Sequence, residues 1–542
     1  MCFFVFFLIK ETKLTRKFLM GNEAVALGAF HARAKRGTGY PGTPSSEILD
    51  VFNRLGGAAA WAPNEKVAAE VALGVAFAGT RAFVTMKHVG LNVAADVLFT
   101  AAYSGVDGAL VFVVADDPGM ASSQNEQDTA RYAVAAGVPL LEPADSQDAY
   151  DFTRLAFAVS ERWKIPVLIK LTTRVCHSGT VVVPRPEDAE APVAKFNRDI
   201  KSHVMVPGHA RPAHRQLRKK LAEIAEWNIK EGPNRRIEGC GDLGIITAGV
   251  AFAHAKEAAP DAAFYKVGMS YPLPMKNLIE FCNDMKRAVV IEENDPCMRD
   301  AILAAGGNLS HVSEEMRFGE LNVHRIRGLL SDDTPEVQPV PSGKPPGLCA
   351  GCPHDRVFRI LKQNDCIVAG DIGCYTLAAL PPLEAMDTQI CMGASIGMGL
   401  GLRHALPEKD ARRVVSVIGD STFVHSGLTG LAEMAYNVPK TGHVLLILDN
   451  GTTAMTGQQE HPGTGRTLDA EPASQLDYAK VAKAMNIPNV FVFDVVKEKD
   501  AFEQALKNAL AKNELTVIIA RRPCVLAAAR LGAQKKPKGG AL

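Results

Sequence analysis

Two short polar motifs lie thirty residues apart and contain the residue types that bind a metal ion. Asp420 follows the apolar run Val414 to Ile418, and Asn450 comes shortly after a second apolar run, Val444 to Leu448. Such runs predict buried parallel strands, whose carboxyl ends form the crevice where open α/β sheets bind ligands. Mg²⁺ prefers carboxylate and amide oxygens and shares its other positions with water and ligand phosphates. The sequence therefore predicts a site for magnesium and a diphosphate group.

The motifs resemble the signature of thiamine diphosphate enzymes, which is Gly-Asp-Gly, a spacer and Asn-Asn. The chain departs from it twice, with Ser421 for the last glycine and Asp449 for the first asparagine. Gly-Asp-Ser alone is usually an ordinary turn, so the prediction depends on the spacing and on the two strands. The resemblance implies cofactor contacts from Gly419, Asp420, Ser421, Asn450 and Thr452, with Asp420, Asn450 and Thr452 also binding Mg²⁺.

The residues after Asn450 narrow the resemblance. The runs Thr452 to Gly457 and His461 to Gly465 look like the α subunit of indolepyruvate:ferredoxin oxidoreductases, within the 2-oxoacid:ferredoxin oxidoreductase family. The resemblance covers Met20 to Cys524. It implies oxidative decarboxylation of aryl 2-oxoacids to acyl-CoA, using thiamine diphosphate, Mg²⁺, a [4Fe–4S] cluster and coenzyme A as co-substrate. It also implies a small β subunit, ferredoxin or another electron carrier as partner, and a homodimer of heterodimers.

Four cysteines are spaced so that they could converge at one end of the last predicted sheet. Cys349 and Cys352 form a Cys-x-x-Cys pair, Cys374 ends the run Gly-Asp-Ile-Gly-Cys, and Cys524 stands just past the apolar run Val517 to Ala520. A single Cys-x-x-Cys pair is ambiguous among a redox dithiol, a zinc site and an iron–sulfur site. The family resemblance implies that the four hold one [4Fe–4S] cluster. The others apart from Cys2, which are Cys176, Cys240, Cys282, Cys297, Cys366 and Cys391, are expected to be buried small hydrophobes.

Two acids in a predicted helix, Pro63 to Gly79, are candidates for acid–base chemistry. Glu65 and Glu70 are five positions apart, so about 500° of helical rotation separates them and they cannot form a carboxylate pair. Either could be a solvated surface charge, and we prefer that interpretation for Glu70. Thiamine enzymes resemble this stretch in placing a glutamate at the start of such a helix, where it hydrogen-bonds the aminopyrimidine. Glu65 matches that position, and its carboxyl would have to be partly desolvated.

Three further residues are candidates for contact with the substrate. Tyr40 to Glu47 reads as a turn that opens a helix, with Ser45 a plausible N-cap, and resembles the Tyr-Pro-x-Thr-Pro-Ser segment of the same family, which implies a substrate-facing Thr43. Lys87 and His88 follow a predicted strand, and the resemblance gives them acid–base or carboxylate-binding roles. The alternatives are an ordinary capped turn and a structural loop histidine.

A glycine-rich turn between Cys374 and Asp420 is a candidate to support the cofactor. Cys391 to Ala394 resembles the turn where thiamine enzymes place an apolar wedge under the cofactor, which implies this role for Met392. Gly373, in the Gly-Asp-Ile-Gly turn, is a further cofactor-binding candidate. The family often has histidine where Gln458 stands, so no role is assigned to that side chain.

Composition excludes several classes of protein. Lys plus Arg number 60 and Asp plus Glu 59 in 542 residues, so no general attraction to nucleic acid or acidic membranes is expected. The apolar start, Cys2 to Ile9, is too short to span a bilayer and lacks the features of a signal peptide. Eleven cysteines, an odd and modest number, argue against a secreted disulfide scaffold and favour a cytoplasmic protein.

Alternation of helices and short strands predicts an α/β fold with two doubly wound thiamine-diphosphate-binding domains and a third α/β domain like the C-terminal domain of transketolases. The expected order is an extension (1–19), the pyrimidine-binding domain (20–180), a connector (181–239), the transketolase-like domain (240–330), a linker (331–346), the diphosphate-binding domain with the iron–sulfur site (347–524) and a flexible tail (525–542). Relatives usually continue into a ferredoxin-like domain, which we expect to be missing here.

Two other functions remain open. A non-oxidative thiamine-dependent decarboxylase would share the metal motif and Glu65 but would have no use for four converging cysteines. A non-catalytic subunit with zinc in those cysteines would have neither iron nor turnover.

Overall fold

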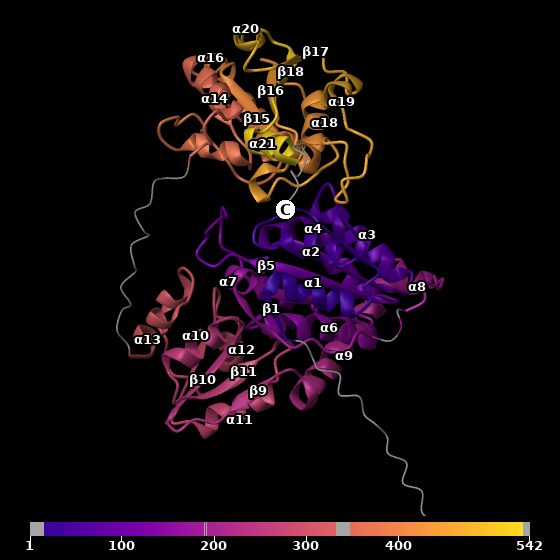
Figure 1. The fold of residues 1–542 in the computed structure, drawn as a ribbon, viewed down its shortest axis with the longest axis vertical. Coiled ribbons are helices and arrows are strands. Elements are labelled where there is room, and N and C mark those ends of the chain that lie inside the picture. Colours follow the sequence, from indigo (N-terminus) through magenta and orange to yellow (C-terminus); the bar gives the residue numbers. More distant parts are fainter. Residues whose placement is uncertain (1–15, 189, 191, 332–346, 535–542) are drawn as a thin grey trace, which may run out of the picture. The chain divides into compact units, whose positions relative to one another are not determined.

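The computed structural model describes residues 16–188, 190, 192–331 and 347–534, so the predicted linker after Ser331, most of the predicted extension and part of the predicted tail fall outside it. The described chain divides into two compact units (Figure 1). The first comprises Met1–Thr38, Thr43–Ala59 and Ala69–Glu336, and the second comprises Gly39–Gly42, Ala60–Ala68 and Val337–Leu542. Two short segments of the N-terminal half therefore pack with the C-terminal half.

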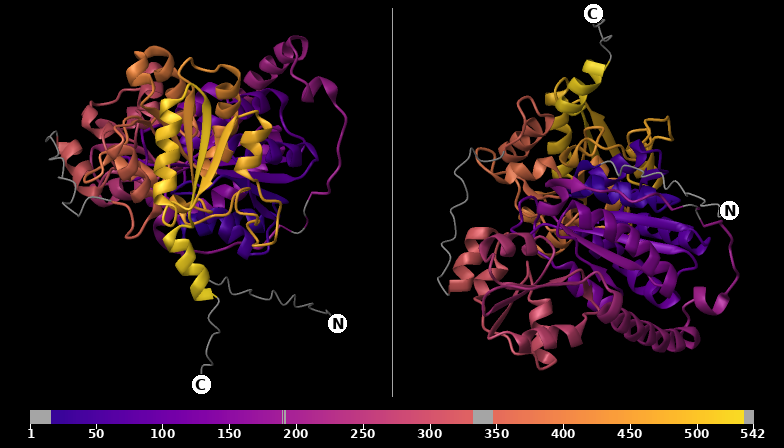
Figure 2. Two further views of the ribbon diagram at one scale, coloured as in Figure 1. Left: turned by 90° about the horizontal axis from the view of Figure 1, so that it is seen from above. Right: turned by 60° about the horizontal axis from the view of Figure 1, so that its bottom comes forward.

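The second unit is built on a parallel five-stranded sheet of order β14-β15-β16-β18-β17, whose last strands are orange to yellow in Figure 2. Its strands are β14 (Ile367–Ala369), β15 (Val414–Gly419), β16 (His443–Asp449), β17 (Asn489–Phe493) and β18 (Leu515–Arg521). Its main helices are α14 (Pro353–Gln363), α15 (Ala394–Ala405), α18 (Leu428–Tyr436), α19 (Tyr478–Ala484), α20 (Lys499–Ala511) and α21 (Val525–Gln534). The strands predicted before the two polar motifs are β15 and β16, and they are neighbours.

Alternation along β16 shows why its sequence is apolar throughout. Leu446 and Leu448 pack in one core with side chains of α14 and α20, whereas Leu445 and Ile447 pack in the other with side chains of α15, α18 and α19. Both faces of the sheet are thus covered by helices, as expected for a doubly wound unit. The polar residues of β16 are confined to its two ends, His443 and Asp449, and the candidate site lies at the carboxyl end.

The first unit contains a seven-stranded sheet of order β12-β6-β7-β5-β4-β2-β3. Its strands are β2 (Arg36–Gly39), β3 (Ala59–Trp61), β4 (Arg81–Lys87), β5 (Ala109–Asp116), β6 (Leu140–Leu141), β7 (Val167–Thr172) and β12 (Met269–Tyr271). Helices in this part are α1 (Gly21–His31), α2 (Glu47–Arg54), α3 (Glu65–Phe77), α4 (His88–Ser104), α5 (Thr129–Ala136), α6 (Ser146–Trp163) and α7 (Thr173–His177). The edge strand β12 runs antiparallel to β6 and comes from the predicted transketolase-like region.

A four-stranded sheet of order β13-β10-β11-β9 completes the first unit, together with a two-stranded antiparallel sheet of β1 (Lys17–Met20) and β8 (Gly179–Val182). Its strands are β9 (Arg235–Ile237), β10 (Leu243–Ala248), β11 (Ala263–Val267) and β13 (Arg287–Ile291). Helices α10 (Ala251–Ala258) and α13 (Val323–Ser331) cover one face, and α11 (Met275–Asp284) and α12 (Cys297–Ala304) the other. The α/β prediction for this region is confirmed.

The predicted connector contains one long helix, α9 (Pro207–Glu231), with Pro207 at its start, where proline is tolerated. The segment after the first polar motif is helical from Asp420, because α17 (Asp420–Thr422) and a π-helical turn (Phe423–Gly427) precede α18. The N-cap position of α2 is Ser46 rather than Ser45.

Within the described residues, helices with enough length and apolar character to cross a membrane were not found.

Candidate active site

The two polar motifs form one hydrogen-bonded structure at the carboxyl ends of β15 and β16. Asp420 is buried, and its Oδ2 accepts hydrogen bonds from the backbone N–H groups of Asn450 (3.2 Å) and Gly451 (2.7 Å). Its Oδ1 accepts from the backbone of Ser421 at 2.9 Å. A carboxylate has about four lone-pair positions, so three such bonds leave room for a metal ion. The arrangement fits a magnesium ligand held in place by the second motif.

The Asn450 side chain is oriented by bonds on both of its ends. Its Nδ2 donates to Nε2 of the buried His354 at 3.3 Å, and its Oδ1 accepts from the backbone of Thr452 at 3.0 Å. Burial lowers the pKa of His354 to about 4, so the ring is neutral and its Nε2 can accept. His354 follows Cys352 by two positions, so the segment that contains the Cys-x-x-Cys pair also orients the Asn450 side chain.

The residues predicted around the cofactor line a single cavity of about 80 Å³ in the second unit. The predicted residues among its lining are Gly373, Met392, Gly419, Asp420, Ser421, Asn450 and Thr452, and Cys374 also lines it. Pockets for whole ligands have about 300–1,000 Å³, so this cavity corresponds to part of a coenzyme site. Its polar wall is the part suited to a metal ion and phosphate oxygens.

Ser421 belongs to a short chain of hydroxyl groups in this wall. Its Oγ lies 2.8 Å from the Tyr40 hydroxyl and 2.8 Å from Thr453 Oγ1. A glycine in its place would break both bonds. The departure from Gly-Asp-Gly is therefore accommodated by neighbouring hydroxyls.

The glycine-rich turn around Met392 is fastened by a buried acid that the sequence did not single out. Asp371 accepts hydrogen bonds from the backbone of Gly393 (2.8 Å) and Ser395 (2.9 Å). Gly393 has φ +88°, and a Cβ there would lie 2.5 Å from Cβ of Ser426, so only glycine fits. This bonding holds Met392 at the cavity wall.

Glu65 begins α3 and is 5% exposed, which satisfies the requirement for a desolvated carboxyl. Its Oε2 lies 2.8 Å from Nε2 of His425, a buried residue of the π-helical turn after Asp420. His425 was not predicted, because none of the sequence motifs includes it. Glu70 is exposed, which agrees with its interpretation as a solvated surface charge.

Thr43, Lys87 and His88 lie in the first unit, and their proposed roles stay predictions. Lys87 ends β4, and its Nζ donates to the backbone oxygen of Ser122 at 2.8 Å. His88 begins α4, with Nε2 3.2 Å from the backbone oxygen of Asn125. Burial lowers the pKa of both side chains.

The four cysteines assigned to a cluster interact with one another. Burial raises the pKa of the Cys374 thiol to about 11, and electrostatic interaction with Cys352, Cys524 and Cys349 adds to the shift. The backbone N–H of Cys524 donates to the backbone oxygen of Asn450 at 3.0 Å. In the part of the chain that the structure describes, no three His, Cys, Asp or Glu residues are arranged to hold a single metal ion. A [4Fe–4S] cluster binds each cysteine to a different iron, and the assignment of these four cysteines to one cluster stays a prediction.

The expectation for the other cysteines was partly wrong. Cys176 and Cys282 are buried as predicted, but Cys240 and Cys391 are exposed, and Cys297 and Cys366 are partly exposed. The reason is their position: Cys240 lies in the turn before β10, and Cys391 lies in the turn before α15.

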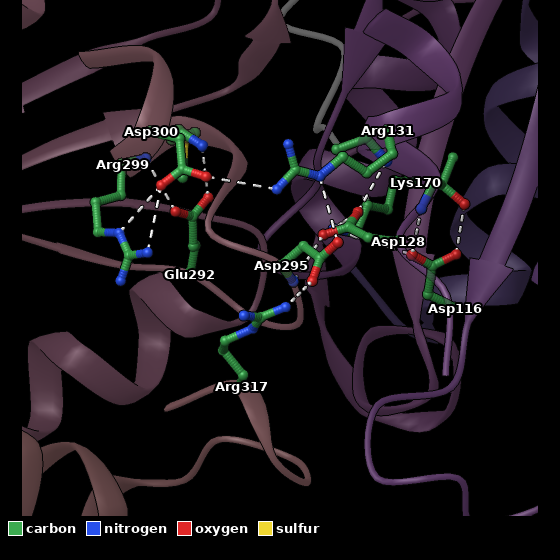
Figure 3. A network of polar contacts seen from close by, with 12 residues as sticks. Asp116, Asp128, Arg131, Lys170, Glu292, Asp295, Arg299, Asp300 and Arg317 are labelled. Atoms are coloured by element: carbon green, nitrogen blue, oxygen red, sulfur yellow. Dashed lines mark hydrogen bonds and ion pairs between the residues drawn. The ribbon is translucent and has the colours of Figure 1, made fainter. Parts of the chain in front are cut away.

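The strand-end acids Glu292 and Glu293 border another cavity, of about 240 Å³, in the first unit. Its wall includes Lys170, which lies 2.7 Å from Asp128 within the polar network of Figure 3. The Glu292 carboxylate accepts from the backbone N–H groups of Met298 (2.9 Å) and Arg299 (3.0 Å) at the start of α12. The positive charge of Lys170 is balanced by its ion pair with Asp128, and Glu292 accepts hydrogen bonds from backbone N–H groups in the first turn of α12. Both residues therefore have structural roles.

Glu292 makes a testable contribution to pH-dependent stability. Burial raises its pKa to about 8, whereas an unfolded glutamate has a pKa of about 4.3. Between these values the folded state binds more protons than the unfolded state, so stability falls as pH rises. In Glu292→Gln we expect the free energy of unfolding to fall less steeply with rising pH, by up to about 1.4 kcal/mol per pH unit. Melting temperatures of both proteins between pH 5 and about pH 8 would measure it.

A matched control is Glu280→Gln, which changes an exposed acid on α11. In Glu292→Gln the new amide nitrogen would face a backbone N–H and impose a penalty, but that penalty does not change with pH. Parallel melting curves of wild type and Glu292→Gln across the range would contradict the prediction.

Two parts of the chain match models of known protein families. Residues 371–520 match the family model "Thiamine pyrophosphate enzyme, C-terminal TPP binding domain", and residues 28–227 match "Pyruvate flavodoxin/ferredoxin oxidoreductase, thiamine diP-bdg". The ketoisovalerate oxidoreductase subunit VorB of Methanothermobacter thermautotrophicus is 23% identical, over 54% of this chain and 91% of the relative. The chain is thus an oxidoreductase subunit with thiamine-diphosphate-binding domains.

Closer relatives define the particular family. The indolepyruvate oxidoreductase subunit IorA of Archaeoglobus fulgidus is 37% identical over 557 residues, covering 96% of this chain and 88% of the relative. The IorA subunit of Pyrococcus abyssi is 37% identical over 94% of this chain and 86% of the relative. The chain belongs to the family of indolepyruvate oxidoreductase subunits IorA. Both the family and the α/β fold predicted from the sequence are confirmed, and the family names imply a partner subunit.

Proposed function

We propose that this chain is the catalytic large subunit of an oxidoreductase that decarboxylates aryl 2-oxoacids of the indolepyruvate type, forms acyl-CoA and passes electrons to ferredoxin. Its proposed groups are thiamine diphosphate, Mg²⁺ and one [4Fe–4S] cluster, with coenzyme A as co-substrate. Its proposed partners are a small β subunit and a ferredoxin or similar carrier, in a homodimer of heterodimers. A reducing cytoplasm suits the four thiols.

One observation carries this proposal. The Asn450 backbone donates to Asp420 at 3.2 Å and accepts from the Cys524 backbone at 3.0 Å. A diphosphate site and an iron–sulfur site would therefore share one backbone segment. A non-oxidative decarboxylase needs only the first of these sites, so the combination favours an oxidative enzyme.

Each candidate residue of the site has a proposed role in binding the metal ion, the coenzyme or the cluster. Asp420, Asn450 and Thr452 would bind Mg²⁺, which bridges to the diphosphate oxygens. Gly419, Ser421 and Gly373 would surround the diphosphate, and Met392 would support the coenzyme from below. Cys349, Cys352, Cys374 and Cys524 would hold the cluster. Thiamine diphosphate supplies the carbanion chemistry, and the protein supplies binding and orientation.

Glu65 would exchange a proton with the coenzyme ring through its buried carboxyl. Thr43, Lys87 and His88 would contact the substrate, with Lys87 offering a positive charge for its carboxylate. These three roles rest on the family resemblance.

Glu65→Gln tests the proposed chemistry. The amide keeps the size of the side chain but cannot exchange the proton, so we expect coenzyme binding to remain and turnover to fall by about 10²- to 10⁴-fold. Dye reduction with indolepyruvate and coenzyme A, together with coenzyme content, would measure both effects. Glu70→Gln, five positions on in the same helix, is the control and should behave as wild type. Wild-type turnover in Glu65→Gln would assign the catalytic acid to another residue.

A further inference from the structure

His425 makes a close polar contact with Glu65, the candidate catalytic acid. Its Nε2 lies 2.8 Å from Oε2 of Glu65, and the two residues are 3% and 5% exposed. No sequence motif or resemblance assigned His425 a role. A hydrogen bond between two buried ionisable groups is stronger than one in water and fixes both side chains.

The imidazole ring is itself held on several sides. Its Nδ1 lies 2.7 Å from Ser426 Oγ, and the Tyr40 ring packs edge-on with centroids 4.8 Å apart. Asn64 Nδ2 donates to the backbone oxygen of His425 at 2.9 Å, while Asn64 Oδ1 accepts from the backbone of Val67 in α3. The start of α3, which carries Glu65, is therefore tied to the π-helical turn that carries His425.

These contacts agree with a ring that carries a proton on Nε2 and donates it to Glu65 Oε2. The second ring nitrogen, Nδ1, shares a hydrogen bond with the Ser426 hydroxyl. Glu65 Oε1 stays outside this bond. The carboxylate is thereby held in one orientation before any coenzyme binds.

We propose that His425 is the positioning residue of Glu65, which its Nε2–H holds by Oε2 so that Oε1 is presented to the coenzyme ring. This inference rests on the proposed function, because only a thiamine-dependent reaction uses Glu65 in this way. His425 itself does not contact substrate or coenzyme in this assignment. The turn after Asp420 thus contributes to the metal site at its start and to the acid–base site one turn later.

The contact can be tested in coenzyme-free protein labelled with ¹⁵N-histidine. The ring resonances of His425 are assigned by their loss in His425→Gln. Glu65→Ala should shift these resonances, whereas Glu70→Ala should leave them in place. Unchanged His425 resonances in Glu65→Ala would overturn the contact on which the inference stands.

The positioning role is tested by the conservative variant. Glutamine can place an amide N–H near the position of Nε2 and donate the same bond, but it cannot ionise. We expect His425→Ala to lower kcat by about 10- to 100-fold with little change in KM or coenzyme content, and His425→Gln to recover most of the loss. Wild-type kcat in His425→Ala, or a His425→Gln variant as slow as His425→Ala, would overturn the positioning role.

Separate results would refute the proposed function and the positioning role of His425. Wild-type protein that binds no thiamine diphosphate would refute the proposed function and with it the positioning role. Wild-type protein that binds the coenzyme and turns over, with His425→Ala equally active, would refute only the positioning role.

Discussion

Replacing Asp420 with alanine should yield folded protein that retains no thiamine diphosphate. The variant loses one of the proposed protein ligands to Mg²⁺ and also the acceptor that holds the backbone of Asn450 and Gly451. Outer-shell changes at metal sites cost about 10- to 100-fold in affinity, so loss of a direct ligand should cost more than about 100-fold. Coenzyme content after gel filtration, with and without added Mg²⁺, measures the effect.

Asp449→Asn is the matched control for this variant. Asp449 ends β16 beside Asn450, but its Oδ2 pairs with the exposed Arg521 at 2.7 Å. Asparagine there restores the Asn-Asn of the thiamine enzyme signature, so coenzyme retention should be unchanged. Equal occupancy in Asp420→Ala and wild type would refute the role of Asp420 in coenzyme binding.

Cys524→Ala should remove the iron–sulfur cluster while leaving the coenzyme bound. The variant deletes one of four proposed ligands but keeps the backbone N–H that donates to Asn450. Iron should fall from about four per chain to near zero, and indolepyruvate-dependent dye reduction should be lost. Iron analysis, visible absorption and thiamine content of one anaerobic preparation report all three properties.

Cys391→Ala is the control, since Cys391 is an exposed cysteine of the same unit that is not among the four. Its iron content should match that of wild type. An unchanged cluster signal in Cys524→Ala would show that the fourth ligand is another group.

The approach of the two polar motifs could be predicted because its signals are local. The runs before Asp420 and Asn450 are apolar apart from Ser416, which identifies strands buried on both faces, and the strand ends then bring the two motifs together. The start of α3 was also predicted within two residues, and Glu65 with it.

His425 and Asp371 could not be found in this way. The segment between Asp420 and Leu428 contains Gly427 and the β-branched Thr422 and Val424, which have low helix propensities. The sequence therefore does not indicate the π-helical turn that the structure has there. Asp371 reads as part of a turn, and its bonds to Gly393 and Ser395 span more than twenty positions. Both roles depend on tertiary contacts between separate segments.

The extent of the sheets was equally hidden in the sequence. Strand β12 consists of three residues, Met269–Tyr271, and joins a sheet formed mainly by residues before Thr172. Tyr40 reads as a turn residue, yet its hydroxyl bonds to Ser421. Such pairings follow from the path of the chain in three dimensions.

The most direct test of the proposed function is one combined analysis of iron, sulfide, zinc and thiamine diphosphate in anaerobically purified protein. The proposed function predicts one thiamine diphosphate, about four irons and about four sulfides per chain, with no zinc. Thiamine diphosphate without iron would indicate a non-oxidative decarboxylase instead. Zinc without iron or thiamine diphosphate would indicate a non-catalytic subunit, and either result would contradict the account.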